Sequence, residues 1–266
     1  MIISYPNGEA FINDNASYLN QNKYLSAFFF LDAPLLTESS PKNYAIKVYS
    51  NDKQLLGILV EPYNLLLYGD VELLEEMLTF IKDNGLELPG IFGPTNIGER
   101  FLEISQELLG KEYHTLVSMD FMEATEITEP SSNEVEIPNL DDVDELCECM
   151  VNFIKDCGLT DPVVKDKIAS NISNYRIIRR DNKIVSLSRR SPETDNSVRI
   201  SAVYTRPEYR GQKLARKVVN NIKNEIINEG MIATLNVDQL NPISNHLYSS
   251  LGFKKVFSQG VYVLRK

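Results

Sequence analysis

The sequence predicts an α/β (α+β) protein of two tandem domains, each a mixed, largely antiparallel sheet flanked by helices on both faces. Three observations support this fold class. A hairpin, a strand, a helix, a strand and a second helix follow one another between residues 44 and 110. The same order returns between residues 175 and 252, which suggests a repeated domain. The chain of 266 residues is also long enough for two domains of roughly 130 residues.

Apolar periodicity assigns the elements of the first half. Residues 7–24 hold many Asn and show little periodicity, whereas the apolar run 24–36 is expected to be buried. The expected elements that follow are a hairpin over 44–49 and 55–60, a strand over 64–68, a helix over 71–82, a strand over 90–92, a helix over 97–109 and a closing strand over 114–122.

A Glu-, Thr-, Pro- and Ser-rich stretch, residues 123–139, has Pro130-Ser131-Ser132-Asn133 at its centre. Such a composition is typical of a linker. We therefore expect one domain over residues 1–130 and a second over residues 134–266.

The second half repeats the pattern of the first. Its expected elements are a helix from Asn139 or Asp141 to Gly158, a short helix over 161–172, a hairpin over 175–179 and 184–190, a strand over 198–205, a helix from Leu214 to Gly230, a strand over 231–237, a helix from Asn241 to Gly252 and a closing hairpin over 254–257 and 261–266. The turn of this last hairpin is expected at Gln259-Gly260.

The loop between the strand 198–205 and the helix that follows it reads Arg210-Gly211-Gln212-Lys213-Leu214-Ala215. A strand that runs through a short glycine-containing loop into a helix leaves several backbone N–H groups unpaired. The positive end of the helix dipole lies behind them. The sequence therefore predicts a phosphate-binding loop here.

A second motif, Asn241-Pro-x-Ser-x-x-Leu-Tyr-x-x-Leu-Gly-Phe253, follows the next strand. The two motifs in this order resemble the acetyl-coenzyme A binding core of the GNAT N-acetyltransferases. The resemblance covers the last half of the chain and, more loosely, the first half. It implies transfer of an acetyl group from acetyl-coenzyme A, as co-substrate, to a primary amine of a small molecule or peptide. One departure is Lys213, which stands where the family pattern has its second glycine and could crowd a diphosphate or attract it.

The resemblance also implies roles for individual residues. The positions that match cofactor contacts are Val203, Tyr204, Thr205, Arg210, Gly211, Gln212, Lys213, Leu214, Ala215, Arg216 and Asn241. Tyr248 matches the tyrosine that protonates the leaving thiolate. Each has a plainer alternative, namely an internal strand for 203–205, a solvated basic turn for the loop, a helix cap for Asn241 and core packing for Tyr248.

The acid–base chemistry is only partly assigned. Deprotonation of the acceptor amine needs a base, and Glu193, Asp195 and Asp238 are candidates among which no motif chooses. His246 is expected at the surface. A metal site is not expected, because Cys147 and Cys149 are two apart on a helix and point to different faces.

Charge is divided unevenly along the chain, whose net charge is −10. Residues 1–133 contain 7 Lys and Arg against 20 Asp and Glu, a net charge of −13, and the remaining 20 against 17 give +3. This acidic half disfavours nucleic acid and anionic membranes as partners and favours a cationic amine, unless the acids are simply solvated. No apolar run reaches the ~18 residues of a membrane span and no signal peptide is evident, so we expect a cytoplasmic protein.

The Tyr68-Gly69-Asp70 turn takes the place of the phosphate loop in the first half. Because Asp70 should repel a diphosphate, the first domain is expected to be a degenerate copy that does not bind the cofactor. Two other functions stay open. One is a non-catalytic acyl-coenzyme A binding or regulatory protein, and the other is a Fem-like aminoacyl transferase, whose tRNA-borne donor the acidic half should repel.

Overall fold

The computed structural model describes residues 1–158 and 162–265 and forms two compact units. Unit 1 contains Met1–Asp120, Asp238–Leu240 and Phe257–Lys266, and unit 2 contains Phe121–Val237 and Asn241–Val256. These units do not coincide with a single cut at the predicted linker, because the chain enters unit 2 at residue 121 and its last residues return to unit 1.

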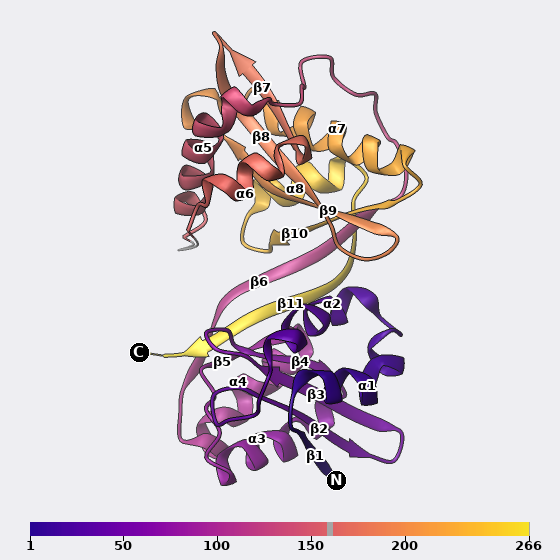
Figure 1. Ribbon diagram of the computed structural model, residues 1–266, viewed down its shortest axis with the longest axis vertical. Helices are drawn as coiled ribbons and strands as arrows, with labels where there is room; N and C mark the ends of the chain where they lie inside the picture. The colour runs from indigo at the N-terminus through magenta and orange to yellow at the C-terminus, as the bar shows by residue number, and fades with distance from the viewer. Residues whose placement is uncertain (159–161, 266) are drawn as a thin grey trace. The chain divides into compact units, whose positions relative to one another are not determined.

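Unit 1 is a sheet with helices on both faces (Figure 1). Its elements are β1 (Ile2–Tyr5), α1 (Gly8–Leu19), α2 (Lys23–Asp32), η1 (Ala33–Leu35), β2 (Tyr44–Ser50), β3 (Lys53–Leu59), β4 (Leu65–Gly69), η2 (Val71–Leu73), α3 (Leu74–Asp83), β5 (Gly90–Pro94), α4 (Thr95–Leu109) and β6 (Tyr113–Ala124). The strand order is β1-β2-β3-β4-β5-β11-β6, with β4 and β5 parallel. Alternation in β4 directs Leu65 and Leu67 towards the core under α3 and α4, and Leu66 towards the core under α1 and α2.

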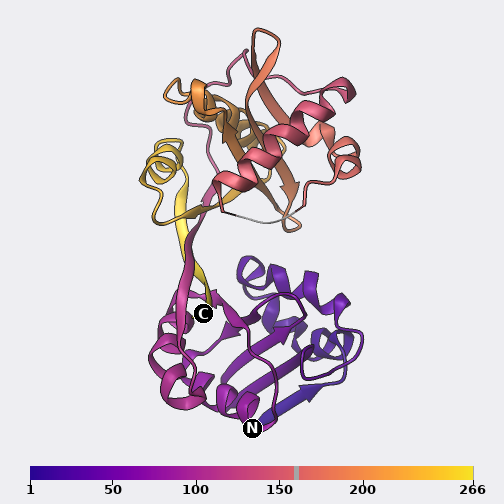
Figure 2. The same ribbon diagram turned by 90° about the vertical axis from the view of Figure 1, so that its left-hand side faces the viewer.

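Unit 2 repeats this arrangement (Figure 2). Its elements are η3 (Leu140–Asp142), α5 (Val143–Asp156), α6 (Lys165–Ser170), η4 (Ile172–Asn174), β7 (Tyr175–Arg180), β8 (Lys183–Pro192), β9 (Ser197–Thr205), η5 (Pro207–Tyr209), α7 (Leu214–Asn228), β10 (Ile232–Asp238), α8 (Pro242–Ser250) and β11 (Lys254–Leu264). The order is β6-β10-β9-β8-β7, with β9 and β10 parallel. One core packs against α7 and α8 and the other against α5 and α6.

The two units share a succession of elements. In unit 1, β4 leads through the short 3-10 turn η2 into α3, and in unit 2, β9 leads through η5 into α7. Apart from the closing hairpin, the predicted hairpins, strands and helices of both halves are present with bounds shifted by a few residues. Two strands are divided between the units. Residues 113–120 of β6 and 257–264 of β11 lie in unit 1, and residues 121–124 of β6 and 254–256 of β11 lie in unit 2.

The closing hairpin predicted around Gln259-Gly260 is wrong. Residues 254–264 form one strand, β11, in which Gly260 pairs with Gly93 of β5. Gly260 serves close packing instead of a turn, because a Cβ on it would lie 2.8 Å from the Tyr262 hydroxyl oxygen.

The helix α1 was not predicted, because its sequence is rich in Asn and weakly periodic. Asn7 caps it, accepting a hydrogen bond from the Ala10 N–H, and Phe11 and Leu19 are fully buried. The predicted start of the short helix at Asp161 lies outside the described residues, and the helix itself, α6, begins at Lys165. No helix in the described part of the chain is long and apolar enough to cross a membrane.

Candidate functional site

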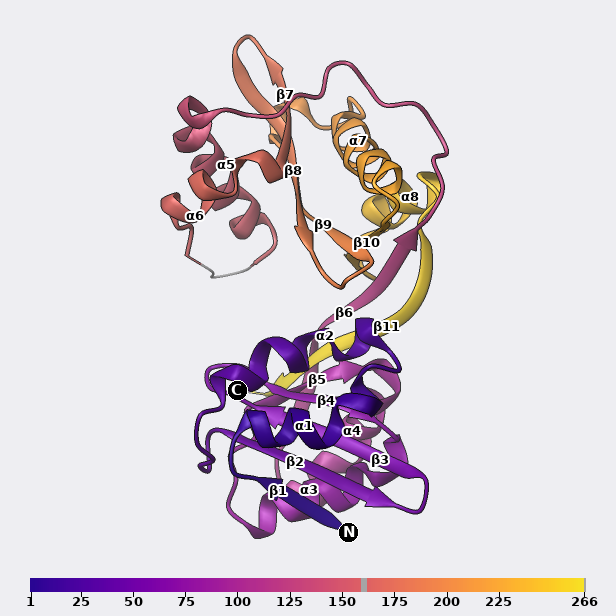
Figure 3. The same ribbon diagram turned by 45° about the vertical axis from the view of Figure 1, so that its right-hand side comes forward.

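A cavity of about 630 Å³ lies in unit 2 where β9, the loop after it, the first turn of α7 and one face of α8 meet. Figure 3 labels β9, α7 and α8 within unit 2. The predicted residues that line it are Val203, Thr205, Arg210, Gly211, Lys213, Leu214, Ala215 and Arg216. The structure therefore brings most of the predicted phosphate-loop residues to the wall of one cavity. No Asp or Glu is among its described lining residues.

Two residues of the loop have left-handed backbone conformations. Gly211 has φ +79°, and Lys213 has φ +59° and ψ 21°. The first is readily adopted by glycine, whereas the second places the Cβ of a lysine in a region that costs L-residues about 1–2 kcal/mol. Lys213 thus has the backbone conformation that a glycine at this position would adopt without strain.

The N-terminus of α7 presents free donors to this loop. The first backbone bond of the helix runs from the Lys217 N–H to the Lys213 carbonyl at 3.2 Å. The N–H groups of Leu214, Ala215 and Arg216 therefore have no helical acceptor, and the helix dipole adds a partial positive charge there. This arrangement suits an anion such as a phosphate.

The strand β9 separates from β10 beside the cavity. Their parallel pairing covers Ser197 to Arg199 of β9 and Ile232 to Thr234 of β10. Among the described residues no pairing between these two strands is found beyond that point, although β9 continues to Thr205. The backbone of the second half of β9 is thus open on the side facing β10, as the predicted role of residues 203–205 requires.

A bulge in β9 decides which side chains face the cavity. Leu187 of β8 pairs with Tyr204, and Arg189 pairs with Ser201, so β9 contains one extra residue, and Ala202 has φ +52°. Because a one-residue shift reverses the alternation, Val203 and Thr205 line the cavity. Tyr204 points instead into the core beneath α5 and is 4% exposed.

Three other predicted residues are placed away from the cavity wall. Gln212 does not line it. Asn241 caps α8, and its side-chain oxygen accepts a hydrogen bond from the Ser244 N–H at 3.0 Å. Tyr248 is buried in the α7–α8 core, with its ring 6.1 Å from that of Phe253 in an edge-to-face arrangement.

Tyr248 nevertheless lies one helical turn after Ser244, a residue of α8 that does line the cavity. Burial raises the pKa of Tyr248 to about 12. This tyrosine is therefore protonated at neutral pH and holds a proton that it can donate.

The face of α8 that lines the cavity was not predicted in detail. It contributes Ile243, Ser244, His246, Leu247 and Ser250. His246, expected at the surface, is exposed and is also part of the cavity wall. Residues 243, 247 and 250 are spaced by four and three positions, so they share one face of α8, opposite the buried Tyr248. This spacing was the sequence signal that they could line the cavity together.

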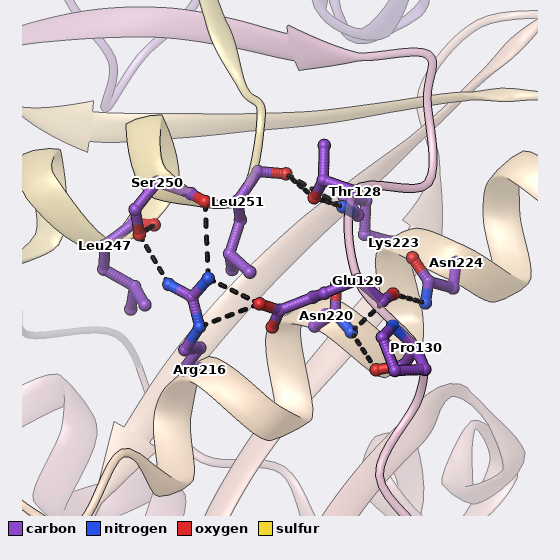
Figure 4. A network of polar contacts seen from close by, with 10 residues as sticks. All are labelled: Thr128, Glu129, Pro130, Arg216, Asn220, Lys223, Asn224, Leu247, Ser250 and Leu251. Carbon is purple, nitrogen blue, oxygen red and sulfur yellow. Dashed lines mark hydrogen bonds and ion pairs between the residues drawn. The ribbon is translucent and has the colours of Figure 1, made fainter.

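The two arginines of the cavity are already paired with carboxylates. The Arg210 Nη2 donates to Asp156 Oδ2 at 2.5 Å, and its Nε donates to the Thr205 carbonyl at 3.1 Å. Arg216 lies between Glu129 and the end of α8, where its Nη1 donates to Ser250 Oγ at 2.5 Å (Figure 4). An anion in the cavity would therefore meet arginine side chains whose charges are partly neutralised by neighbouring acids.

The predicted linker is not a free segment. Its residues 129–132 lie along α7, where buried asparagines hold their backbone (Figure 4). Asn220 Nδ2 donates to the Pro130 carbonyl at 2.9 Å, and Asn224 Nδ2 donates to the Glu129 carbonyl at 2.9 Å. Asn221 exchanges two hydrogen bonds with the Ser132 backbone. The sequence signal was the polar run Asn220-Asn221 within an apolar helix.

None of the three candidate bases lines the cavity. The Glu193 carboxylate is almost fully buried, at 2% exposed, and pairs with Arg199 and with the Thr234 hydroxyl. Asp238 accepts a hydrogen bond from the Leu240 N–H at 2.8 Å. The structure therefore gives no support for Glu193 as a free base.

Comparison with known proteins agrees with this architecture. Residues 190–263 match the family model described as FR47-like protein. The chain is similar to an acetyltransferase of the GNAT family from Colwellia psychrerythraea, with 14% identity, a TM-score of 0.65 and 100% of both chains covered. It is also similar to a GCN5-related N-acetyltransferase from Sphaerobacter thermophilus, with 13% identity, a TM-score of 0.63, and 98% of this chain and 94% of that chain covered.

A tandem GNAT protein from the clavulanic acid biosynthesis pathway has 8% identity and a TM-score of 0.56, with 100% of this chain and 98% of that chain covered. No curated protein matches the chain. The predicted tandem GNAT fold is thus confirmed, and a segment of its second half, residues 190–263, matches the FR47-like family model.

Proposed function

We propose that this protein transfers an acetyl group from acetyl-coenzyme A to a primary amine of a small molecule or peptide. The observation that carries the proposal is the single cavity of about 630 Å³ that joins the N-terminus of α7 to the open edge of β9. Its two ends differ in chemistry. One offers backbone N–H groups and cationic side chains, and the other offers Val203 and Leu247, which suits a ligand with an anionic head and an uncharged arm.

The residues around the cavity then divide the binding of the coenzyme between them. The N–H groups of Leu214, Ala215 and Arg216, with the cations Arg210 and Lys213, would hold the diphosphate of the coenzyme. The open backbone of Val203 and Thr205 would orient its arm along β9. When bound, the coenzyme supplies an acetyl group activated as a thioester. Direct attack of the amine within a ternary complex follows from placing both partners in one cavity.

Proton transfer is assigned to α8. We propose that Tyr248 donates a proton to the departing sulfur, either directly or through the hydroxyl of Ser244, one helical turn earlier on the cavity wall. The high pKa of Tyr248 keeps the proton in place until negative charge develops nearby. His246 is the imidazole that α8 contributes to the described cavity wall, and is a candidate for accepting the proton of the amine.

We propose that cofactor binding belongs to unit 2. In unit 1 the equivalent turn holds Asp70, whose Oδ2 accepts a hydrogen bond from the Gln54 N–H at 2.8 Å. The first turn of α3 carries Glu75 and Glu76, and Glu72 precedes it. Four carboxylates at this helix start disfavour a diphosphate. The acidic residues 1–133, with a net charge of −13, favour a cationic amine as substrate, and the protein is expected to act in the cytoplasm.

A thiol-release assay with acetyl-coenzyme A over a panel of primary amines tests the proposal, alongside calorimetry with coenzyme A. Amine-dependent thiol release is the expected result. Tight binding with no release for any amine would favour a non-catalytic acyl-coenzyme A binding protein, which the absence of carboxylates among the described cavity-lining residues also fits. Transfer from aminoacyl-tRNA in place of acetyl-coenzyme A would favour the Fem-like alternative.

A further inference from the structure

A second cavity, of about 500 Å³, lies within unit 1. It opens between the end of α2 with η1 and the starts of β4 and β5, and Met119 of β6 and Val261 of β11 complete its wall. Most of the wall is apolar. Leu66 is buried, and Phe28 and Phe92 stand edge to face with their ring centroids 5.4 Å apart. The rigid aromatic pair gives the cavity a preformed wall.

Asp32 is the one charged residue among the described residues of this wall. It stands at the last position of α2 and at the start of η1, but its carboxylate does not cap that turn. Within the described part of the chain it has neither a hydrogen bond nor an ion pair. Burial raises the pKa of Asp32, because the apolar surroundings replace part of its hydration. A half-buried, unpaired carboxylate is costly unless a cation meets it.

The rim of this cavity exposes apolar side chains. Leu31 is 64% exposed, Leu35 is 56% exposed and Tyr63 is 56% exposed. Large exposed apolar groups around a concave, mostly apolar surface are characteristic of ligand sites. The polar Asn64 is the further hydrogen-bonding side chain of the wall.

We propose that this cavity binds an organic cation with an apolar body, that is, an aryl- or alkylammonium ion. The ammonium group pairs with the Asp32 carboxylate, and the ring or chain packs against the wall that Phe28 and Phe92 form. Tyr63 at the rim offers an aromatic face to the cation. The net charge of −13 over residues 1–133 raises the local concentration of such cations. The site belongs to unit 1 and does not depend on acyl transfer by unit 2.

Calorimetry on the full-length protein with three matched probes tests the proposal. The probes are 2-phenylethylamine as cation, 2-phenylethanol as neutral analogue and 3-phenylpropionate as anion. We expect the amine to bind one site with a Kd at least about tenfold lower than that of the alcohol, because a charge-assisted hydrogen bond is added. No binding of the propionate is expected. Saturation with coenzyme A should leave the amine affinity of this site unchanged.

Three variants locate the binding. Asp32→Asn should weaken amine binding by about tenfold or more and leave the alcohol unchanged. Glu107→Gln, which removes one charge from an exposed position of α4 outside the cavity, should change neither. Leu35→Ser, at the exposed rim, should weaken the amine and the alcohol alike.

Equal amine affinity of Asp32→Asn and the parent protein would overturn the proposal, as would equal affinity for amine and alcohol. Absence of any amine binding would overturn it too. If Asp32→Asn does not fold, the comparison of Leu35→Ser with the parent decides, because a site elsewhere would not respond to a change at this rim.

Discussion

Glu129 Oε2 accepts hydrogen bonds from both Nε and Nη2 of Arg216, at 3.2 and 2.6 Å. The two residues are 87 positions apart, and both side chains are about one-third exposed or less. Arg216 lines the cavity at the first turn of α7, whereas Glu129 belongs to the segment that asparagines of α7 hold in place. A carboxylate is thereby fixed beside the proposed diphosphate site, where it offsets the charge of an arginine that the site uses.

Glu129→Gln should tighten coenzyme A binding. The amide keeps an acceptor for Arg216 but removes a negative charge close to the diphosphate, and two charges a few ångströms apart at a protein surface interact by roughly 1 kcal/mol or more. We expect the Kd to fall about three- to tenfold, with a smaller effect at high salt. Calorimetry at two salt concentrations measures it. Glu126→Gln, in the same segment and exposed, is the control. Weaker binding by Glu129→Gln would show that its charge positions Arg216 productively.

Lys213→Gly should stabilise the protein. The backbone at Lys213 has φ +59°, so glycine removes a strain of about 1 kcal/mol or more, less the entropy that glycine loses on folding. The expected gain is about 0.5–1 kcal/mol, or a rise in Tm of up to ~4 °C. Lys213→Ala retains the strain and removes the charge. Both variants should bind coenzyme A more weakly if the lysine attracts the diphosphate, and only Lys213→Gly should bind more tightly if the side chain crowds it.

The sequence predicted the succession of elements well because β-strand alternation, helical periodicity and glycine stops are local signals. It also located the cavity through the Arg210 loop, since a strand, a glycine loop and a helix start give the same geometry wherever they occur. The direction of the Tyr204 side chain could not be predicted in this way. The bulge at Ala202 reverses the two faces of β9, and it cannot be read from strand alternation because it depends on pairing with β8.

Non-local pairing also explains the error at the chain's end and the contacts of the predicted linker. Gly260 reads as a turn residue until its opposition to Gly93 is known. Asn220 and Asn224 are polar residues of α7, yet each is nearly fully buried and bonds to the backbone near Glu129. Whether a glycine turns the chain or admits a neighbour depends on contacts made from distant positions.

The burial of Lys223 predicts how the free energy of unfolding depends on pH. This lysine is fully buried in α7, and its Nζ donates to Thr128 Oγ1 and to the Leu251 carbonyl, both at 2.8 Å (Figure 4). Burial lowers its pKa below the usual 10.5. Between the lowered folded pKa and 10.5 the unfolded chain binds more protons, so the free energy of unfolding should rise with pH.

Urea denaturation at several alkaline pH values measures this slope, which can reach about 1.4 kcal/mol per pH unit for one proton. Lys223→Met should lose the slope, and the Thr128 hydroxyl keeps its own bond to the Leu251 carbonyl at 3.0 Å. Lys254→Met, which removes an exposed lysine, is the control and should keep it. The same slope in Lys223→Met and the parent would assign it to another group.

Variants of Tyr248 and His246, both on α8, can distinguish a role in proton transfer from a role in packing. If the Tyr248 hydroxyl donates to the leaving sulfur, Tyr248→Phe should lower kcat by about 100-fold or more, since general acids contribute roughly 100- to 10,000-fold. The ring still packs on Phe253, so the Kd for acetyl-coenzyme A and the Tm should be nearly unchanged. Ser244→Ala should give a smaller loss if the proton passes through the hydroxyl of this cavity-lining residue.

His246→Gln provides the matched comparison, because it changes a titratable group that lines the cavity without touching the core. If His246 accepts the proton of the amine, its loss should lower kcat/KM and should leave the Kd for acetyl-coenzyme A unchanged. Steady-state kinetics of both variants with one amine substrate over pH 6–9 distinguishes the two roles. Full turnover by Tyr248→Phe at saturation would remove the proposed donor, and the buried ring would then be a packing residue of the α7–α8 core.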